Sequence, residues 1–247
     1  MKASGAAPSP IDPEHKRGWQ IRRMFGAIAP RYDLLNHLLS ANMDRVWRRA
    51  AVRRVQRALP GTGGPILDLC TGTGDLAVGL ARLAPVVGCD FCHPMLKIAD
   101  GKIRRLNLEP KVWLAEGDAL ALPFGDCRFA AVTVAFGLRN LEDLRRGLGE
   151  IHRVLQPGGV AAILEFSTPS QRVFRRLYFF YFRRILPRIG RLISGEQGPY
   201  SYLPESVERF PDQERLRELM ISVGFEQVTY DNLTGGIAAL HVGVKRG

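Results

Sequence analysis

Ile66-Leu-Asp-Leu-Cys-Thr-Gly-Thr-Gly-Asp75 is the stretch of this 247-residue chain that decides its fold. The apolar residues 66–70 predict a short buried strand, and the residues from Asp75 onward predict a helix. Gly72 and Gly74 lie between the two elements, where the backbone has to turn tightly and a missing Cβ lets a ligand approach closely. A strand that enters a helix through a glycine-rich turn is typical of a nucleotide-binding α/β protein.

Strands and helices alternate on the C-terminal side of this turn. The apolar pattern predicts strands at 86–90, 112–115, 129–136 and 160–166, and helices at 75–83, 94–106 and 141–155. A last helix at 212–223 ends at Gly224, and strands at 228–230 and 237–244 close the chain. The alternation predicts an α/β fold: a doubly wound, mostly parallel, seven-stranded sheet that is covered by helices on both faces.

The chain on the N-terminal side of the turn has a different character. Residues 1–13 are small, polar and proline-rich, which predicts a disordered leader. Residues 14–59 show helical periodicity with breaks at Pro30 and at 40–42, and 60–65 form a linker. Residues 168–204 interrupt the later alternation with arginines and aromatic residues, which predicts a helical insertion before the last strands. We expect a single domain over 14–247.

The positive charge is concentrated in two segments. The chain has 35 Lys and Arg against 24 Asp and Glu, a net charge of +11. Residues 14–57 carry +8 and residues 166–195 carry +7, so the remaining residues are net negative at −4. Such an excess predicts nucleic acid or an anionic membrane as a partner. The four cysteines are too few for a disulfide framework, and no apolar run approaches the ~20 residues of a membrane span, so we expect a cytoplasmic protein.

Three alternatives fit the glycine turn: NAD, S-adenosylmethionine, or a structural turn without a ligand. Asp90 ends the second predicted strand, where an acid can hold ribose hydroxyls in either cofactor. Asp68 and Asp75 place negative charge where the pyrophosphate of NAD would lie, whereas the cationic sulfonium and amino groups of S-adenosylmethionine suit them. Asp118 follows the third strand and can accept the adenine amino group, while Ala119 packs on the ring. We therefore favour S-adenosylmethionine.

Further motifs along the chain make the sequence resemble the C-methyltransferases of menaquinone and ubiquinone biosynthesis, a family of class I S-adenosylmethionine-dependent methyltransferases. The resemblance extends from about Trp19 to Lys245. Its specific marks are Met24-Phe-Gly-Ala-Ile-Ala-Pro-Arg-Tyr-Asp33, the glycine turn, Phe136-Gly-Leu-Arg-Asn140, Arg153-Val-Leu-Gln-Pro-Gly-Gly159, Leu164-Glu-Phe-Ser167 and Ala239-Leu-His241.

The resemblance implies a cofactor and a substrate class. Family contacts to S-adenosylmethionine fall on Thr73, Asp90, Asp118 and Ala119. Ala135 departs from family members that have a cofactor-binding serine there, and Gly26 departs from members with aspartate. The implied substrate is a polyprenyl quinol. Demethylmenaquinol is favoured, and 2-methoxy-6-polyprenyl-1,4-benzoquinol is the alternative. An RNA methyltransferase or a non-enzymatic protein of this fold is disfavoured, and we expect no nucleic-acid partner.

Arg139 and Asn140 follow the fourth predicted strand, at the sheet edge where ligands bind. We expect Arg139 to stabilise a developing phenolate and Asn140 to orient the quinol. The alternative is that Arg139 caps the strand or pairs with Glu165. Tyr32 and His241 are candidate substrate-pocket residues, with core or surface roles as alternatives.

No metal site is predicted, because Cys89 and Cys92 form a CxxC with only one further cysteine, Cys70, expected nearby.

The arginine and aromatic segment at 168–204 has two interpretations. It is either a lid that lies on anionic lipid and admits a quinol from the bilayer, or a helical hairpin that buries its aromatic rings. We favour the lid, with 14–59 as a substrate-side region. This predicts peripheral attachment to the inner face of the cell membrane. Self-association into a homo-oligomer stays open.

Overall fold

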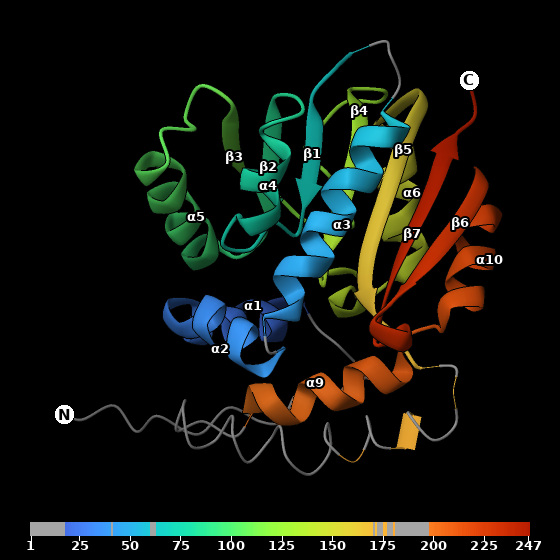
Figure 1. Ribbon diagram of the computed structural model, residues 1–247. Coiled ribbons are helices and arrows are strands. Elements are labelled where there is room, and N and C mark those ends of the chain that lie inside the picture. Colours follow the sequence, from blue (N-terminus) through green and yellow to red (C-terminus); the bar gives the residue numbers. More distant parts are fainter. Residues whose placement is uncertain are drawn as a thin grey trace.

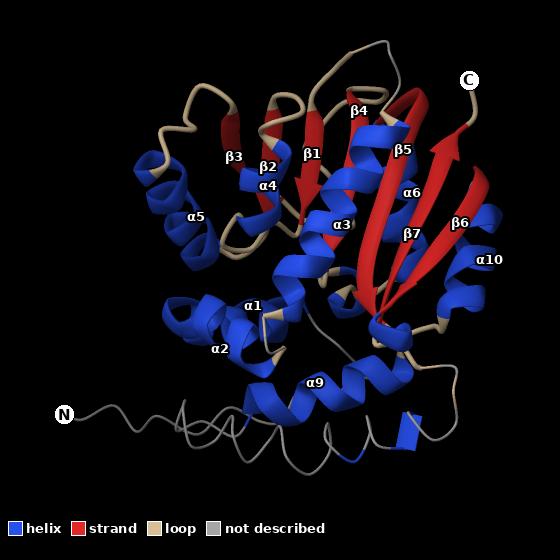
Figure 2. Ribbon diagram, in the orientation of Figure 1, coloured by secondary structure: helices blue, strands red, loops and turns tan. Residues whose placement is uncertain are grey.

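A seven-stranded sheet forms the centre of the computed structural model (Figures 1 and 2). The structure describes residues 18–40, 42–59, 63–169, 171, 175, 176, 180 and 198–247. The strand order is β3-β2-β1-β4-β5-β7-β6. The strands are β1 (Ile66–Leu69), β2 (Val86–Asp90), β3 (Val112–Glu116), β4 (Phe129–Ala135), β5 (Leu155–Phe166), β6 (Phe225–Leu233) and β7 (Ala238–Lys245).

The strand directions confirm a doubly wound, mostly parallel sheet. β1 to β5 run parallel to one another, and β7 runs antiparallel to β5 and to β6. The chain proceeds outward from β1 to β3 and then returns to place β4 on the other side of β1. The loops after β1 and β4 therefore leave the sheet in opposite directions, and a crevice forms at their carboxyl ends.

Helices cover both faces of the sheet because each presents an apolar stripe to it. One core contains Trp47, Ala51 and Val55 together with side chains of the two helices that follow β1 and β2. The other contains Leu148 and Met220. The first face carries α3 (Met43–Ala58), α4 (Asp75–Leu80) and α5 (His93–Arg105), and the second carries α6 (Leu144–Val154) and α10 (Gln213–Val223).

A third group of helices lies below the carboxyl edge of the parallel strands in Figure 1. It consists of α1 (Gly18–Ile28), the 3-10 turn η1 (Ala29–Arg31), α2 (Tyr32–Leu39) and α9 (Gly198–Arg209). The predicted break at Pro30 is present, since η1 separates α1 from α2. Segments that lie far apart in the sequence thus meet at the crevice.

Several element bounds differ from the predicted ones. The helix predicted at 141–155 begins only at Leu144, because the Asp143 side chain accepts the Arg146 N–H and caps it. The strand predicted at 160–166 begins at Leu155, because Leu155 already pairs with Phe129 of β4; Gln156-Pro-Gly-Gly159 forms the register shift before the pairing resumes at Val160, with Gly158 at φ = +75°. β6 is longer than 228–230, since the polar residues around it lie on an edge strand with one solvated face.

Two predicted segments lie wholly or largely outside the described residues: the leader at 1–13 and most of the insertion at 168–204. Within the described part of the chain, no helix has the length and apolar character needed to cross a membrane.

Candidate active site

A cavity that is open to solvent, with about 870 Å³ of empty space including its solvent-filled mouth, occupies the crevice at the carboxyl ends of β1 to β4. The polar side chains that line it are those of Asp90, Asp118, Asn140 and Glu142 and the phenol of Tyr32, together with apolar and aromatic groups. The residues lining it are Gly18, Phe25, Tyr32, Leu69, Cys70, Gly72, Asp90, Phe91, Met95, Gly117, Asp118, Ala119, Leu120, Ala135, Phe136, Gly137, Asn140, Leu141 and Glu142.

The glycine turn forms the floor of this cavity. Gly72 has φ = +56° and Gly74 has φ = +82°, a left-handed backbone that other residues rarely adopt. A Cβ placed on Gly72 would meet nothing closer than the ring of Tyr32 at 4.0 Å. Gly72 therefore needs its glycine for the backbone angle and leaves space above it open. Gly74 lies behind the cavity wall, where an added Cβ would be 3.2 Å from that of Ala99.

Asp68 is buried beneath the turn and does not line the cavity. Its carboxylate accepts hydrogen bonds from the hydroxyls of Thr71 at 2.6 Å and Thr133 at 2.7 Å. Burial raises the pKa of Asp68 to about 6, and the two hydroxyls oppose part of that rise. The Asp68 side chain thus ties β1 to the turn and to β4. Its carboxylate is hydrogen-bonded to groups of the protein itself.

Asp90 and Asp118 form the acidic end of the cavity. Asp90 accepts the Gly72 N–H and the Cys92 N–H, each at 2.8 Å. Burial raises the Asp90 pKa, and these backbone donors counteract the rise. Asp118 accepts the Leu120 N–H at 2.9 Å, which turns the chain after β3. Both carboxylates are therefore held in place by backbone donors before any ligand binds.

Thr73 points away from the cavity and joins the turn to the N-terminal helices. Its hydroxyl donates to Asp33 of α2 at 2.5 Å, and Lys102 of α5 bonds Asp33 at 2.9 Å. Lys102 also pairs with Asp75. The Thr73 side chain thus contacts α2 and does not line the cavity, and its contact with a cofactor stays a prediction.

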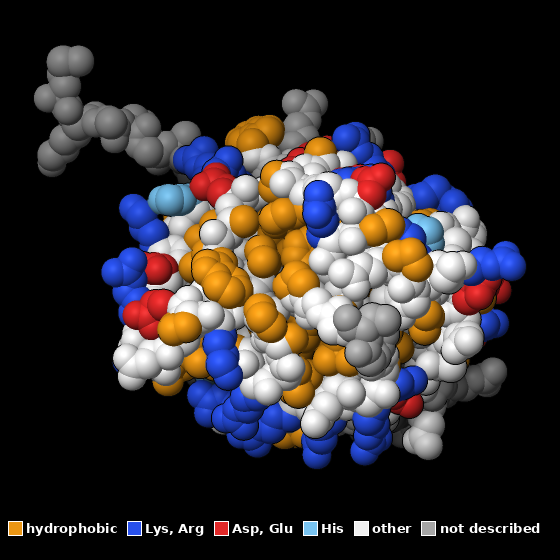
Figure 3. Space-filling model, turned by 90° about the horizontal axis from the view of Figure 1, so that it is seen from above, with side chains coloured by type: hydrophobic (Ala, Val, Ile, Leu, Met, Phe, Trp, Pro, Cys, Tyr) orange, Lys and Arg blue, Asp and Glu red, His pale blue; other side chains and the backbone are white. Residues whose placement is uncertain are grey.

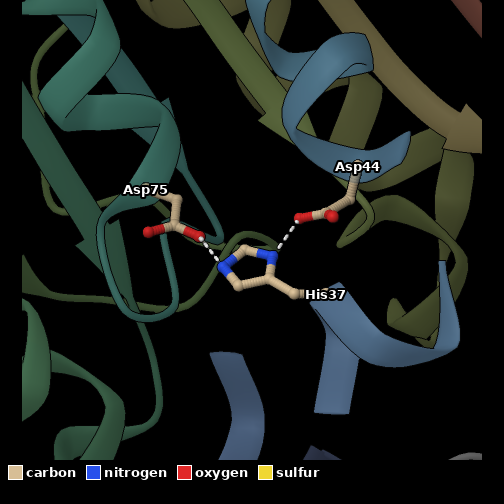
Figure 4. A group of neighbouring side chains, drawn as sticks. All are labelled: His37, Asp44 and Asp75. Atoms are coloured by element: carbon tan, nitrogen blue, oxygen red, sulfur yellow. Dashed lines mark hydrogen bonds and ion pairs between the residues drawn. The ribbon is translucent and has the colours of Figure 1, made fainter. Parts of the chain in front are cut away.

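A second polar cluster continues this junction (Figure 4). His37 of α2 lies between two carboxylates: its Nδ1 is 2.9 Å from Asp44 of α3, and its Nε2 is 4.0 Å from Asp75 of α4. Arg48 pairs with Asp44, and Lys102 with Asp75. In the described part of the chain, His37, Asp44 and Asp75 are the one group close enough to ligate a metal ion, but both carboxylates already neutralise a basic side chain.

The end of the cavity beside β4 is aromatic. Phe136 and Asn140 follow β4 there, and Tyr32 of α2 lines the cavity over Gly72. Burial raises the pKa of Tyr32, with the nearby Arg139 opposing the rise, so its phenol stays protonated at neutral pH. Gly137 has no room for a side chain, because an added Cβ would lie 2.3 Å from that of Cys70. The turns after β1 and β4 therefore touch directly, which keeps the two ends of the cavity in register.

Arg139 and Glu165 form a buried ion pair beside this end. Arg139 Nη1 is 2.7 Å from Glu165 Oε1, and the guanidinium lies over the Phe166 ring at 5.3 Å. Arg139 is only 6% exposed and does not line the cavity, whereas Asn140 does. The alternative expected for Arg139, an ion pair with Glu165, is therefore present. Arg139 lies beside the cavity and is not part of its wall.

His241 lies elsewhere. It is buried on β7, where its Nε2 is 2.8 Å from the Gln213 carbonyl of α10 and its ring lies 5.2 Å from that of Tyr230. Burial lowers its pKa, so the neutral form is favoured. The structure does not bring His241 to the cavity and gives it a core role.

Other lining residues were not singled out from the sequence. Phe91 directly follows Asp90, and its place after a strand end could have indicated it. Phe25 and Met95 lie on helices whose orientation only the packing of α1 and α5 decides. Cys89 and Cys92 are buried free cysteines that pack in the hydrophobic clusters, and neither lines the cavity.

The comparisons with known proteins identify the family. The sequence model of the ubiE/COQ5 methyltransferase family matches residues 13–245. This chain belongs to the ubiE/COQ5 methyltransferase family. It is therefore a methyltransferase, as the motifs predicted.

Relatives with curated names cover nearly the whole chain. The demethylmenaquinone methyltransferase of Thermus thermophilus is 54% identical over 89% of this chain and 99% of its own length. That of Deinococcus radiodurans is 47% identical, over 96% and 97%. The ubiquinone/menaquinone biosynthesis C-methyltransferase UbiE of Geobacter sulfurreducens is also 47% identical, over 93% and 90%.

Solved structures of the same fold support the architecture. The [4+2]-cyclase SpnF superposes with a TM-score of 0.66 at 17% identity and covers 98% of this chain and 99% of its own. Phosphoethanolamine N-methyltransferase 2 of Haemonchus contortus, in complex with S-adenosyl-L-methionine, has a TM-score of 0.58 at 16% identity, over 80% and 52%. At these identities the likeness shows the fold, which is the class I methyltransferase fold predicted for this ubiE/COQ5 family member.

Replacement of Asp68 by asparagine tests how its burial affects stability. Because the pKa of Asp68 is about 6 in the folded state against a usual 3.8, the folded protein holds this proton more tightly than the unfolded chain. Its favourable contribution is complete only well below the unfolded-state pKa of 3.8 and is lost as the pH rises through 6. Between pH 4 and 7 the wild type should lose ~2.4 kcal/mol of unfolding free energy relative to Asp68→Asn.

Urea unfolding at several pH values measures this difference. Asp100→Asn serves as the control, since Asp100 lies on the surface of α5, and its difference from wild type should stay nearly constant. A pH-independent difference for Asp68→Asn would contradict the assignment.

Proposed function

We propose that this chain transfers the methyl group of S-adenosylmethionine to a ring carbon of demethylmenaquinol. The observation that carries the proposal is a cavity at the switch point of the sheet, with the carboxylates of Asp90 and Asp118 after β2 and β3, Phe136 and Asn140 after β4, and Tyr32 over Gly72 between them. The names of the relatives from Thermus thermophilus and Deinococcus radiodurans support this substrate.

The acidic end fits the nucleoside part of S-adenosylmethionine. A carboxylate has several acceptor positions, so Asp90 can bind ribose hydroxyls while it holds Gly72 and Cys92. Asp118 is placed to accept the adenine amino group, and Ala119, Phe91 and Met95 supply apolar surface for the ring. The open space above Gly72 lets the ligand approach the backbone. When bound, the cofactor supplies an electrophilic methyl group on a positively charged sulfur.

The aromatic end fits a quinol ring. Methyl transfer requires the ring carbon, the methyl carbon and the sulfur to lie in line, and such positioning can contribute ~7–11 kcal/mol to lowering a barrier. Phe136 provides an apolar wall at this end, while Phe25 packs in the cluster that contains Phe91 and Met95. Asn140 and the protonated phenol of Tyr32 can hold the two quinol oxygens through hydrogen bonds. A held ring presents one carbon to the methyl group.

The quinol oxygen becomes negative when its hydroxyl loses a proton to water, and the Asn140 amide can stabilise that oxygen by donating a hydrogen bond. The ring carbon of this quinolate then attacks the methyl carbon, the carbon–sulfur bond breaks to leave a neutral thioether, and the methylated carbon loses its proton to water, which restores the aromatic ring. Arg139 lies behind it, buried and paired with Glu165, so we assign Arg139 a supporting electrostatic role and not direct contact.

A cofactor-binding measurement tests the acidic end. Asp90→Asn should weaken the binding of S-adenosylhomocysteine by about ten- to a hundredfold, because hydrogen bonds to a charged group are worth ~1.5–3 kcal/mol. Isothermal titration calorimetry gives the dissociation constants. The control Asp126→Asn changes an exposed carboxylate near α6 and should bind like the wild type. Equal binding by Asp90→Asn, or no binding by the wild type, would argue against this cofactor site.

A labelled-methyl assay tests the substrate. The wild type should transfer tritiated methyl to reduced demethylmenaquinol and not to its oxidised form, because only the quinol is electron-rich enough to attack. Asn140→Ala should lower kcat by about tenfold or more, as expected for loss of a donor to the quinolate oxygen. Asn107→Gly, at the exposed end of α5 with φ = +53°, is the control and should keep wild-type kcat.

The alternative substrates belong in the same assay. Preferential labelling of 2-methoxy-6-polyprenyl-1,4-benzoquinol would assign the ubiquinone reaction, which the name of the Geobacter sulfurreducens relative also includes. Labelling of RNA alone would overturn the quinol proposal.

We further propose that the protein binds the inner membrane surface to reach its polyprenyl substrate. Arg45, Arg49, Arg53 and Arg57 follow one another at four-residue spacing on α3, which forms an exposed stripe about 18 Å long. No ion pair of these four arginines occurs within the described residues. Figure 3 shows Lys and Arg gathered along one margin of the molecule, on the side of α3. Anionic lipid contributes ~1 kcal/mol per basic residue at the surface.

Vesicle sedimentation tests this attachment. Changing the four stripe arginines to glutamine should reduce binding to vesicles with 30% phosphatidylglycerol, roughly a hundredfold or more, and added salt should weaken the wild type. The control changes Lys97, Arg105, Lys111 and Arg128 to glutamine, which removes the same charge from other exposed positions. Equal losses in both variants would contradict a role for the stripe.

A further inference from the structure

Tyr202 of α9 contacts Asn140, the polar side chain at the aromatic end of the cavity. The two residues are 62 positions apart, and the Tyr202 hydroxyl donates a hydrogen bond to Asn140 Oδ1 at 3.1 Å. Tyr202 is 4% exposed, although it belongs to the group of helices below the sheet edge. α9 therefore supplies a buried polar contact to the site from outside the sheet.

This contact decides which atom of the Asn140 amide faces the cavity. An asparagine amide has an acceptor oxygen on one side and a donor nitrogen on the other, and rotation by half a turn exchanges them. The Tyr202 hydroxyl occupies the oxygen, while Asn140 Nδ2 lies 3.4 Å from the Phe136 carbonyl. The nitrogen, with its second N–H, is the group left to serve a ligand.

The phenol of Tyr202 is suited to act as a permanent donor. Burial raises its pKa to about 12, with Arg139 opposing the rise and Glu165 adding to it. The hydroxyl consequently keeps its proton throughout the working pH range. A phenolate would accept a hydrogen bond instead and would turn the amide nitrogen away from the cavity.

We propose that Tyr202 is a positioning residue for methyl transfer: its hydroxyl holds the Asn140 amide with the N–H side toward the quinol oxygen that becomes negative. The proposal rests on the proposed quinol substrate, because a donor stabilises a phenolate and an acceptor would oppose it. Tyr202 itself does not line the cavity.

Tyr202→Phe removes only the hydroxyl and keeps the buried ring. It should lower kcat for demethylmenaquinol about three- to tenfold, the range of one neutral hydrogen bond, while the KM for S-adenosylmethionine stays unchanged. In an Asn140→Ala background the same change should have no further effect, because the amide it orients is gone. Tyr230→Phe is the matched control: Tyr230 is half-buried on β6 beside His241, outside the cavity.

A second readout does not depend on turnover. In ¹⁵N-labelled protein, the side-chain amide signals of Asn140 are identified by their loss in Asn140→Ala. They should shift in Tyr202→Phe and stay in place in Tyr230→Phe.

The outcomes separate this proposal from the proposed function. Unshifted Asn140 signals in Tyr202→Phe overturn the positioning role, as does an equal loss of kcat in both backgrounds. A wild type that methylates no quinol, with Asn140 signals that do shift, overturns the proposed function and with it the catalytic meaning of the contact, while the contact itself stands.

Discussion

The buried carboxylate of Asp68 is the constraint on which the site depends. It lies on β1 and accepts hydrogen bonds from Thr71 in the glycine turn and Thr133 on β4, so one side chain joins the two strands that border the switch point to the loop between them. A buried carboxyl group needs such partners, since burial without them is costly. The same arrangement lets the turns after β1 and β4 touch at Cys70 and Gly137, and the cavity forms where those turns diverge from the sheet.

The N-terminal helices complete the cavity through a polar junction. Thr73 and Asp75 of the glycine turn region are bound by Asp33, His37 and Lys102. α1 adds a contact between the Gly18 N–H and Glu142 at the cavity rim. The glycine turn and the N-terminal helices that cover the cavity are consequently parts of one hydrogen-bonded unit. A shift of α2 would therefore move the turn as well. α9 joins the opposite end through Tyr202 and Asn140.

Local pattern predicted most of the fold because each element carries its own signal. The alternation of apolar strands with amphipathic helices and the Gly224 helix end are present as predicted. The sequence pattern gave wrong strand bounds where pairing between strands determines the backbone more strongly than the local residue types do. Gln156-Pro-Gly-Gly159 has the residues of a turn but lies inside β5 as a bulge, since β4 pairs with Leu155 before it and with Val160 after it. The polar residues of β6 made the predicted strand too short, because an edge strand needs only one apolar face.

The sequence by itself determined the fold class, the glycine turn and the family, since these depend on residue types at fixed spacing along the chain. It also indicated Asp90, Asp118, Tyr32 and Asn140, which line the cavity because the carboxyl ends of parallel strands and the helix beside them meet at one edge. Only the tertiary structure decided the direction of each side chain. It placed Thr73 against Asp33, paired Arg139 with Glu165, and buried His241 against α10. Contacts between residues far apart in the chain depend on packing, which spacing alone does not encode.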